Sequence, residues 1–492
     1  MNNDNIKLLF GLKIKQLRIE NKLSLLEVAN KSGLSVSYLN EIEKGKKYPK
    51  SDKIVALAET FGIDYDSLVS LKLNSNLAPI VNMLNSNFLK DFPLEVFGIN
   101  PAALIDLMSE TPTKLSAFVN TIIEIGRSYN MTVEDFYAAV LRSYQEMNAN
   151  YFPEIEERIE TFLCENGIEQ DQILDEAFLI DFLDEKYGLK IQYFDEKSHP
   201  KLGSLRSVYL AKRKIIMLNA LISSDQRVFT LGREVAFQSM GVKIRPLTSS
   251  WVNFENFEQI FNNFKASYFS VGILIQKQHL ELKLNEFFSK TAFIAEDLNQ
   301  ISEYFKATPE TLFHQMANVL TQKFGVEDLF FLRFDNNINQ ELYYLTKEIH
   351  LSKQYAPNGI VDEHYCRRWL SIDILKELKF QQNEKLYEKP LAGLQHSTFY
   401  NTDNEYFVFS MARPLNIVKD VNVSVSIGFK LNDAIRNKIK FVNDPSIIKK
   451  IVNRTCERCA IFDCRDRVAS PRILQKRRKN EELRQLITDL TQ

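Results

Sequence analysis

Residues 24–45, SLLEVANKSGLSVSYLNEIEKG, predict two short amphipathic helices joined by a tight turn. In the first helix, Leu25 and Val28 fall on one face, and Ser24 stands where an N-cap residue is expected. Gly33 can adopt the left-handed backbone conformation that a tight turn between helices needs. The stretch therefore predicts a helical pair that presents its second helix at the surface.

The second helix is expected to begin at Ser35, with Leu39 and Ile42 on its apolar face. Its opposite face carries Ser37, Tyr38, Asn40 and Glu41. In a helix-turn-helix arrangement the second helix enters the major groove of DNA, where polar side chains contact base edges. We therefore predict that this face reads the DNA sequence.

A run of lysines follows the second helix. Flexible ammonium groups suit phosphate oxygens better than bases, so these side chains are expected to position the protein on DNA without specifying sequence. The alternative interpretation is a helical hairpin with an unrelated lysine cluster. The predicted DNA-contacting residues are Ser24, Ser35, Ser37, Tyr38, Asn40, Glu41, Lys46 and Lys47.

Residues 12–68, with the sequence IEKGKKYP at 42–49 after the second helix, resemble the Cro/cI-type helix-turn-helix (XRE) family. The resemblance implies an all-α domain of five helices that binds a double-stranded DNA operator. It also implies a homo-oligomer, a dimer or a tetramer, because such domains read paired half-sites.

The composition predicts a multidomain globular protein. The chain has 492 residues, 45% of them apolar, and a net charge of −1, so DNA contact is expected only in the N-terminal domain. We find neither a secretory signal nor an apolar stretch of the roughly twenty residues that a membrane span needs. Five cysteines are too few for a secreted disulfide scaffold, so a cytoplasmic protein without membrane contact is expected.

Changes in periodicity along the chain predict four segments. They are an all-α helix-turn-helix domain at 1–70, a helical linker and dimerisation region at 71–175, an α+β domain at 176–325 and an α+β sensor domain at 326–492. In the second segment, Cys164 is expected to be a buried apolar residue. In the third, paired strands are expected at SVYLA and KIIML, before a helix from Asp225 to Met240.

The sequence SSDQRVFTLGREVAFQ at 223–238 resembles the active-site helix of the ImmA/IrrE metallopeptidase family. Such a zinc site needs two histidines four residues apart on a helix, with a glutamate between them. Here Arg233 and Phe237 occupy the histidine positions, and neither has a lone pair for zinc, so only Glu234 is kept. We therefore predict a degenerate peptidase domain with no catalytic residues, which is not an enzyme.

A disabled active site leaves a cleft, and basic side chains are expected around it. Guanidinium groups bind phosphates through paired hydrogen bonds, so an anionic, nucleotide-like ligand is predicted there. The alternative is that these charges belong to an ordinary solvated surface. The predicted ligand-binding residues are Tyr151, Arg206, Tyr209, Arg213 and Arg233.

Four later stretches are distinctive: FFLRFDNNIN at 330–339, HYCRRW at 364–369, VSIGFKL at 425–431 and TCERCAIFDCRDRVASP at 455–471. Together they resemble bacterial short-chain fatty acyl-CoA-responsive transcriptional regulators, although Arg367 stands where that family has a proline. The resemblance implies a C-terminal region that senses acyl-coenzyme A as effector. It also implies an iron-sulfur cluster, which some members are thought to hold.

Cys456, Cys459 and Cys464 form a C-x2-C-x4-C pattern, and three thiolates so close in sequence can reach one metal centre. Cys366 is the expected fourth metal ligand, with His364 in reserve. The spacing leaves open an iron-sulfur cluster and a structural zinc ion. Free or disulfide-forming thiols are the alternative.

Three functions remain open from the sequence. The first is a DNA-binding transcriptional regulator controlled by a short-chain acyl-CoA or a related metabolite. The second is a redox-sensing regulator that uses the cysteines. The third is a regulatory metalloprotease like ImmA, and the missing histidine pair counts against it.

Overall fold

The structure is a computed structural model that describes residues 3–70, 97–98, 121, 132–248, 254, 256–351 and 363–491. By its internal contacts the chain divides into two compact units, Met1–Val140 and Leu141–Gln492. Much of the predicted linker at 71–175 lies outside the described residues. Among the helices of the described ranges, none combines the length and the apolar character needed to cross a bilayer.

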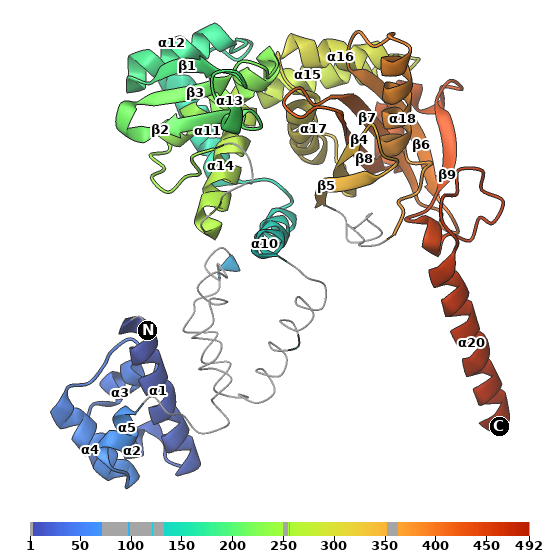
Figure 1. Ribbon diagram of the computed structural model, residues 1–492. Coiled ribbons are helices and arrows are strands. Elements are labelled where there is room, and N and C mark those ends of the chain that lie inside the picture. Colours follow the sequence, from blue (N-terminus) through green and yellow to red (C-terminus); the bar gives the residue numbers. More distant parts are fainter. Residues whose placement is uncertain are drawn as a thin grey trace. The chain divides into compact units, whose positions relative to one another are not determined.

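The first unit contains a module of five short helices, as the sequence predicted. They are α1 (Asn3–Glu20), α2 (Leu25–Ser32), α3 (Val36–Glu43), α4 (Ser51–Phe61) and α5 (Tyr65–Val69), drawn in blue in Figure 1. Ile14, Val28, Leu39 and Leu57 are fully buried in their common core. Gly11 lets α1 lie close to α3, because a Cβ there would stand 2.2 Å from the Ile42 carbonyl oxygen.

The second unit begins with helices packed around a small sheet. The helices of this region are α10 (Val133–Met147), which crosses from the first unit, α11 (Pro153–Glu165), α12 (Glu176–Tyr187), α13 (Ser224–Ser239) and α14 (Phe257–Leu274). The strands are β1 (Lys190–Phe194), β2 (Ser207–Leu210) and β3 (Ile215–Asn219), in the order β1-β3-β2. β2 pairs with β3 antiparallel and β1 pairs with β3 parallel, which confirms the predicted strand pair and the helix after it.

A six-stranded sheet follows, after three more helices. The elements are α15 (Lys277–Phe288), α16 (Ala295–Tyr304), α17 (Pro309–Lys323), β4 (Leu329–Asn337), β5 (Tyr343–His350), α18 (Leu370–Asn383), β6 (Leu391–Phe399), β7 (Glu405–Pro414), β8 (Val421–Lys430), α19 (Asp433–Lys438) and β9 (Ile448–Val452). The strand order is β5-β4-β8-β7-β6-β9. All neighbours are antiparallel except β6 and β9, which are parallel.

Both faces of the six-stranded sheet are covered, because successive side chains of a strand point to opposite faces. From β4, Phe330 and Leu332 join the core under α18, whereas Leu329 and Phe331 join the core shared with α17. The second of these cores runs without a break into the region of the three-stranded sheet. Segments 176–325 and 326–492 therefore share one hydrophobic core.

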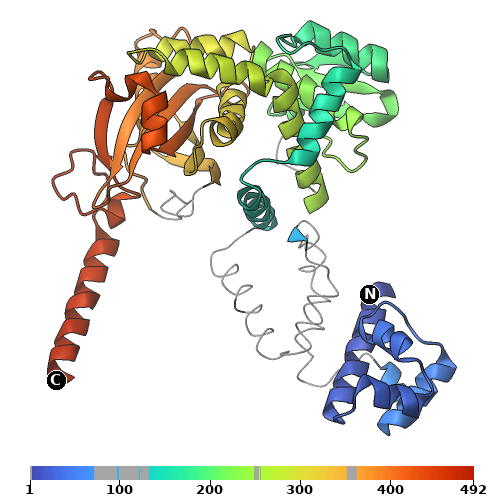
Figure 2. The same cartoon turned by 180° about the vertical axis from the view of Figure 1, so that it is seen from behind.

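The chain ends in α20 (Arg472–Thr491), which has no buried residue. In both Figure 1 and Figure 2 this helix extends away from the six-stranded sheet. The protein thus has an N-terminal helix-turn-helix module followed by mixed α and β regions with two sheets.

Candidate functional site

The two helices that flank the turn, α2 and α3, are each capped at the N-terminus by a serine. The Ser24 hydroxyl accepts a hydrogen bond from the Glu27 amide at 3.2 Å, and the Glu27 carboxylate accepts one from the Ser24 amide at 2.7 Å, which is a capping box. The Ser35 hydroxyl accepts from the Tyr38 amide at 3.2 Å. Gly33 has φ of 68°, the left-handed conformation expected of the turn. Ser24 and Ser35, two of the three serines predicted to contact DNA, thus cap the starts of α2 and α3.

The predicted base-reading face of α3 is accessible. Ser37 is exposed, while Tyr38, Asn40 and Glu41 are half-buried. The Lys47 ammonium lies 2.8 Å from the Glu41 carboxylate, and this hydrogen bond raises the pKa of Lys47. Lys46 is exposed. Lys47 therefore lies beside Glu41, and its ammonium is 5.8 Å from the centre of the Tyr38 ring.

A buried ion pair connects α3, the second helix of the helix-turn-helix, to α1. Arg18 of α1 donates to both carboxylate oxygens of Glu43, at 2.7 and 2.9 Å, and the Glu43 side chain is 5% exposed. The hydrogen bond to Glu43 raises the pKa of Arg18. Because both oxygens are engaged, the pair fixes α3 against α1 in one orientation.

A buried ion pair connects α13 to the loop that follows it. The Arg245 guanidinium donates to both carboxylate oxygens of Glu234, at 2.6 and 2.5 Å, and the two side chains are 6% and 3% exposed. The same guanidinium stacks over the rings of Tyr209 and Phe237, at 4.1 and 4.0 Å. Glu234 is therefore bound to an arginine that the sequence analysis did not select.

Arg233 is buried beside this pair. Its guanidinium donates to the Asn263 side-chain oxygen at 3.1 Å, while its Nε has no partner in the described residues. Burial lowers the pKa of Arg233 to about 10, with Glu234 opposing the shift and Arg245 adding to it. A buried cation held by one neutral amide is costly unless a negative group lies near.

Further cations lie between the two sheets of the second unit, where Arg206 interacts electrostatically with both Arg233 and Arg333. We call this group, together with the Glu234–Arg245 pair, the arginine cluster. Its cations are Arg206, Arg233, Arg245, Arg333, Lys347 and Arg413, and its carboxylates are Glu234, Glu310 and Asp335. Six cations face three carboxylates, which leaves an excess of positive charge.

The carboxylate Glu310 is strongly affected by this charge. Burial would raise the pKa of Glu310, but Lys347, Arg333 and Arg206 outweigh it and hold that pKa well below its usual range. The neighbouring His314 stacks on a phenylalanine ring and lies 2.7 Å from the Lys347 ammonium. Burial, with Lys347 adding, lowers the pKa of His314 to about 3, so this imidazole adds no positive charge at neutral pH.

The structure separates the five residues predicted to bind a ligand. Arg206, Tyr209 and Arg233 belong to the arginine cluster or contact it. Tyr151 instead lies under the Lys277 ammonium, 4.4 Å from its ring centre, and Arg213 is exposed on the turn before β3. Five members of the arginine cluster were not predicted from the sequence: Arg245, Glu310, Arg333, Lys347 and Arg413. An arginine inside the apolar strand FFLRF was the one local signal.

Cys366, Cys456, Cys459 and Cys464, the four cysteines predicted as metal ligands, line one pocket. Two backbone hydrogen bonds place Cys366 beside Cys456: the Cys366 amide donates to the Arg454 carbonyl at 3.0 Å, and the Cys456 amide donates to the His364 carbonyl at 2.9 Å. Burial raises the pKa of Cys366 to about 11, opposed by backbone hydrogen bonds, with the nearby thiols Cys459 and Cys456 adding to the rise. Cys366, Cys456 and Cys459 are buried and Cys464 is half-buried.

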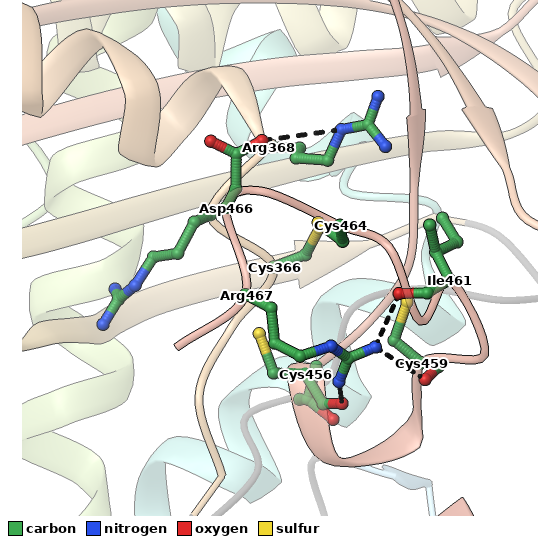
Figure 3. Close-up of a pocket in the computed structure, with 10 residues that line it drawn as sticks. Cys366, Arg368, Cys456, Cys459, Ile461, Cys464, Asp466 and Arg467 are labelled. Atoms are coloured by element: carbon green, nitrogen blue, oxygen red, sulfur yellow. Dashed lines mark hydrogen bonds and ion pairs between the residues drawn. The ribbon is translucent and has the colours of Figure 1, made fainter. Parts of the chain in front are cut away.

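Arg467 orders the loop that carries three of these cysteines. Its guanidinium donates to the carbonyls of Cys456, Cys459 and Ile461 at 2.7, 3.0 and 2.8 Å. Figure 3 shows this guanidinium among the three carbonyls, with Cys366 and Cys464 near the same pocket. The arginine therefore holds the loop through carbonyl groups and brings positive charge close to the thiols.

Two residues near the cysteines have other partners. The His364 ring lies 2.8 Å from the Glu457 carboxylate, and Arg458 pairs with Glu363 at 2.6 Å. Across the described residues, no three histidine, cysteine or acidic side chains converge closely enough for a single metal ion. The prediction for Cys164 was wrong, because that side chain is exposed at the end of α11.

Comparisons with known proteins agree with the first unit. A family model for a helix-turn-helix domain matches residues 11–73. The HTH-type transcriptional regulator DdrOP3 of Deinococcus deserti is 33% identical over 57 residues, which cover 12% of this chain and 44% of that protein. The N-terminal module is thus a DNA-binding helix-turn-helix domain, as predicted.

A more extended similarity reaches into the second unit. The propionyl-CoA carboxylase regulator of Cereibacter sphaeroides is 21% identical over 350 residues, covering 67% of this chain and 69% of that protein. A Mycobacterium tuberculosis transcriptional regulator of known structure aligns at 13% identity with a TM-score of 0.48, over 67% of this chain and 92% of that one. With the helix-turn-helix domain, the sequence similarity identifies a DNA-binding transcriptional regulator distantly related to the Cereibacter protein.

Proposed function

We propose that a short-chain acyl-coenzyme A, or a related anionic metabolite, controls how tightly this regulator binds its operator. The arginine cluster is the observation that carries the proposal. Its excess cations are half-buried or buried, and such charges need a negative partner to offset their lost hydration. The phosphates of a coenzyme A ester are suitable partners, because guanidinium groups bind them through paired hydrogen bonds.

The relative's name supports this class of effector. The distantly similar Cereibacter protein is a regulator of propionyl-CoA carboxylase, an enzyme whose name includes a short-chain acyl-CoA. A ligand changes DNA binding only if its affinity differs between the DNA-bound and free forms of the protein. We therefore expect the acyl-CoA to favour one of these two forms.

The test begins with an operator selected by the full chain from random DNA duplexes. Fluorescence anisotropy then measures its Kd with and without propionyl-CoA, with free coenzyme A as a second ligand. We expect Kd to change by about tenfold, because allosteric coupling energies are typically about 1–3 kcal/mol. An operator affinity that stays the same with every acyl-CoA tested would exclude the proposal.

Two arginine variants locate the effector. Arg206→Gln removes a charge from the arginine cluster and should abolish the response to propionyl-CoA while operator affinity without ligand stays unchanged. Arg158→Gln is the matched control, since Arg158 is exposed on α11. An equal response in the wild type and in Arg206→Gln would show that the effector binds elsewhere.

A second function, redox sensing, is favoured by the four cysteines around one pocket. Their thiols are suitable ligands for an iron-sulfur cluster, which would be held by Cys366, Cys456, Cys459 and Cys464 and would supply a redox-active centre. The same four thiols would also suit one tetrahedral zinc ion, which would stabilise the loop without redox chemistry.

Metal analysis of anaerobically purified protein tests the cysteine site. We expect iron and sulfide in the wild type, a loss of both in Cys366→Ser, and no loss in Cys164→Ser, whose cysteine is exposed on α11. If oxidation alone is the signal, air should weaken operator binding and propionyl-CoA should not. This second function would be excluded if the purified protein contains no iron and its Kd for the operator is the same with and without air.

The structure does not favour a protease. Both carboxylate oxygens of Glu234 accept hydrogen bonds from Arg245, so this carboxylate is engaged and cannot activate a water molecule without breaking a buried ion pair.

A further inference from the structure

A second pocket lies next to the cysteine pocket, on the side of α18. It is bounded by the turn between β4 and β5, by α18 and by the loop after Cys464, and its volume is about 420 Å³. Pockets of this size accommodate small metabolites. This phosphate pocket, as we name it, is distinct from the arginine cluster.

The phosphate pocket is lined by more cations than carboxylates. The cations are Arg367, Lys376, Lys379, Arg465 and Arg467, and the carboxylates are Glu341 and Asp466. Lys376 and Lys379 stand three residues apart, so they share one face of α18. The Asp466 carboxylate lies 3.9 Å from the guanidinium of Arg368, a residue that does not line this pocket. Five positive charges thus meet two negative ones.

Few of these cations are neutralised within the protein. Among the described residues, Lys379 and Arg465 make no hydrogen bond or ion pair, and Lys376 donates to the Arg367 carbonyl at 3.4 Å. The Arg467 guanidinium binds backbone carbonyls rather than carboxylates. A pocket that concentrates uncompensated positive charge attracts anions.

Arg367 stands between the two pockets and lines both of them, as do Asp466 and Arg467. It is buried, its guanidinium stacks 4.3 Å from the Tyr343 ring centre, and it donates to the Glu341 carbonyl at 2.9 Å. This stacking fixes the plane of the guanidinium at the base of the phosphate pocket. Cys366 directly precedes Arg367 in the sequence, so a ligand bound at Arg367 would lie close to the cysteine pocket.

We infer that this pocket binds a small ligand with a diphosphate or phosphate ester group, held by Arg367 and the two lysines of α18. A diphosphate carries enough negative charge to offset the excess of three positive charges on the lining. A monocarboxylate would leave most of that charge unpaired. The site is independent of the proposed effector site, which lies at the arginine cluster.

Isothermal titration calorimetry of the full chain at constant ionic strength tests the inference, with pyrophosphate, inorganic phosphate, ADP and coenzyme A as probes. We expect saturable binding of pyrophosphate or ADP, and a loss of at least about tenfold in affinity when Lys376→Gln and Lys379→Gln are combined. Tighter binding of ADP than of pyrophosphate would identify a nucleotide, and the reverse order a simple phosphate ester. Either order supports the site.

Three controls make the result decisive. Lys385→Gln removes an exposed lysine just beyond α18 and should not change binding. Lys379→Arg keeps the charge and should retain binding if the double variant has lost it. Arg206→Gln should leave pyrophosphate binding intact, which separates this pocket from the proposed effector site.

Two results would overturn the inference. One is the absence of saturable binding by all four probes, and the other is equal affinity in the wild type and the double lysine variant. If coenzyme A binding is lost in the double lysine variant but kept in Arg206→Gln, the phosphate pocket is supported and the proposed location of the effector is wrong.

Discussion

Alanine at Asn40 should weaken recognition of the operator without weakening DNA binding in general. The Asn40 side chain lies on the accessible face of α3 and makes no hydrogen bond with the described residues, so its loss should not destabilise the fold. An asparagine that contacts an adenine with both its amide NH2, as donor, and its amide oxygen, as acceptor, discriminates by about 1–3 kcal/mol. Asn40→Ala should therefore raise Kd for the operator by roughly 5- to 150-fold and leave Kd for random DNA unchanged.

Alanine at Lys46 should act on every DNA sequence alike. Lys46 is exposed and is not paired with a carboxylate in the described residues, so its whole charge is available to a phosphate. Each phosphate contact contributes about 0.9 to the slope of log affinity against log salt concentration. Removing one contact should reduce that slope by about 0.9 for each DNA-bound subunit, which is about 3.5-fold in affinity per subunit between about 50 and 200 mM salt.

Fluorescence anisotropy with the operator and a random duplex, at several salt concentrations, measures both effects. The ratio of the two Kd values reports discrimination, and the salt dependence of each Kd reports the phosphate contacts. An equal loss on both duplexes for Asn40→Ala would refute the assignment of base reading to Asn40. A loss on the operator alone for Lys46→Ala would refute the assignment of phosphate binding to Lys46.

Three further variants test the packing and the buried charges. Gly11→Ala should destabilise the N-terminal domain by about 1–3 kcal/mol, because the new Cβ meets the Ile42 carbonyl, and limited proteolysis should show earlier cleavage there. Arg245→Leu should cost about 3–5 kcal/mol in urea unfolding by leaving Glu234 buried and unpaired, and adding Glu234→Gln should recover part of this; an unchanged midpoint would contradict a buried pair. Below pH 6.5 the unfolded chain protonates His314 while the folded chain, with a pKa of about 3, does not. Unfolding free energy should therefore fall with decreasing pH by up to about 1.4 kcal/mol per pH unit from this residue, and His314→Gln should flatten the profile between pH 4.5 and 6.5.

The helix-turn-helix module could be predicted from the sequence because its signals are local. Ser24, Gly33 and Ser35 set the helix boundaries within a few residues of one another, and each makes the expected cap or turn. The helix predicted from Asp225 to Met240 begins and ends one residue earlier, at Ser224 and Ser239.

The arginine cluster could not be predicted, because its members come from distant parts of the chain. Arg245 reaches Glu234 from a loop after α13, and Arg333 approaches Glu310 from β4. Neither partner is marked by spacing in the sequence. Such a cluster forms only when residues from both sheets come together in the fold. The spacing of apolar residues along the chain predicts single helices and strands, and it does not predict these distant contacts.

The error at Cys164 had a signal in the sequence. Ile155, Ile159 and Phe162 are buried on one face of α11 at helical spacing. A residue two positions after Phe162 is rotated by roughly 200° about the helix axis, which places Cys164 on the opposite, exposed face. Cys366 is a different case, because it lies far in sequence from Cys456, Cys459 and Cys464. It was grouped with them only because it is also a cysteine, and the structure places all four around the same pocket.

Operator binding by the full chain, measured with and without propionyl-CoA under anaerobic conditions, tests the central claim most directly. We predict a change in Kd of about tenfold in the wild type, and no change in Arg206→Gln. An operator affinity that is identical with and without the acyl-CoA in both proteins would contradict the account.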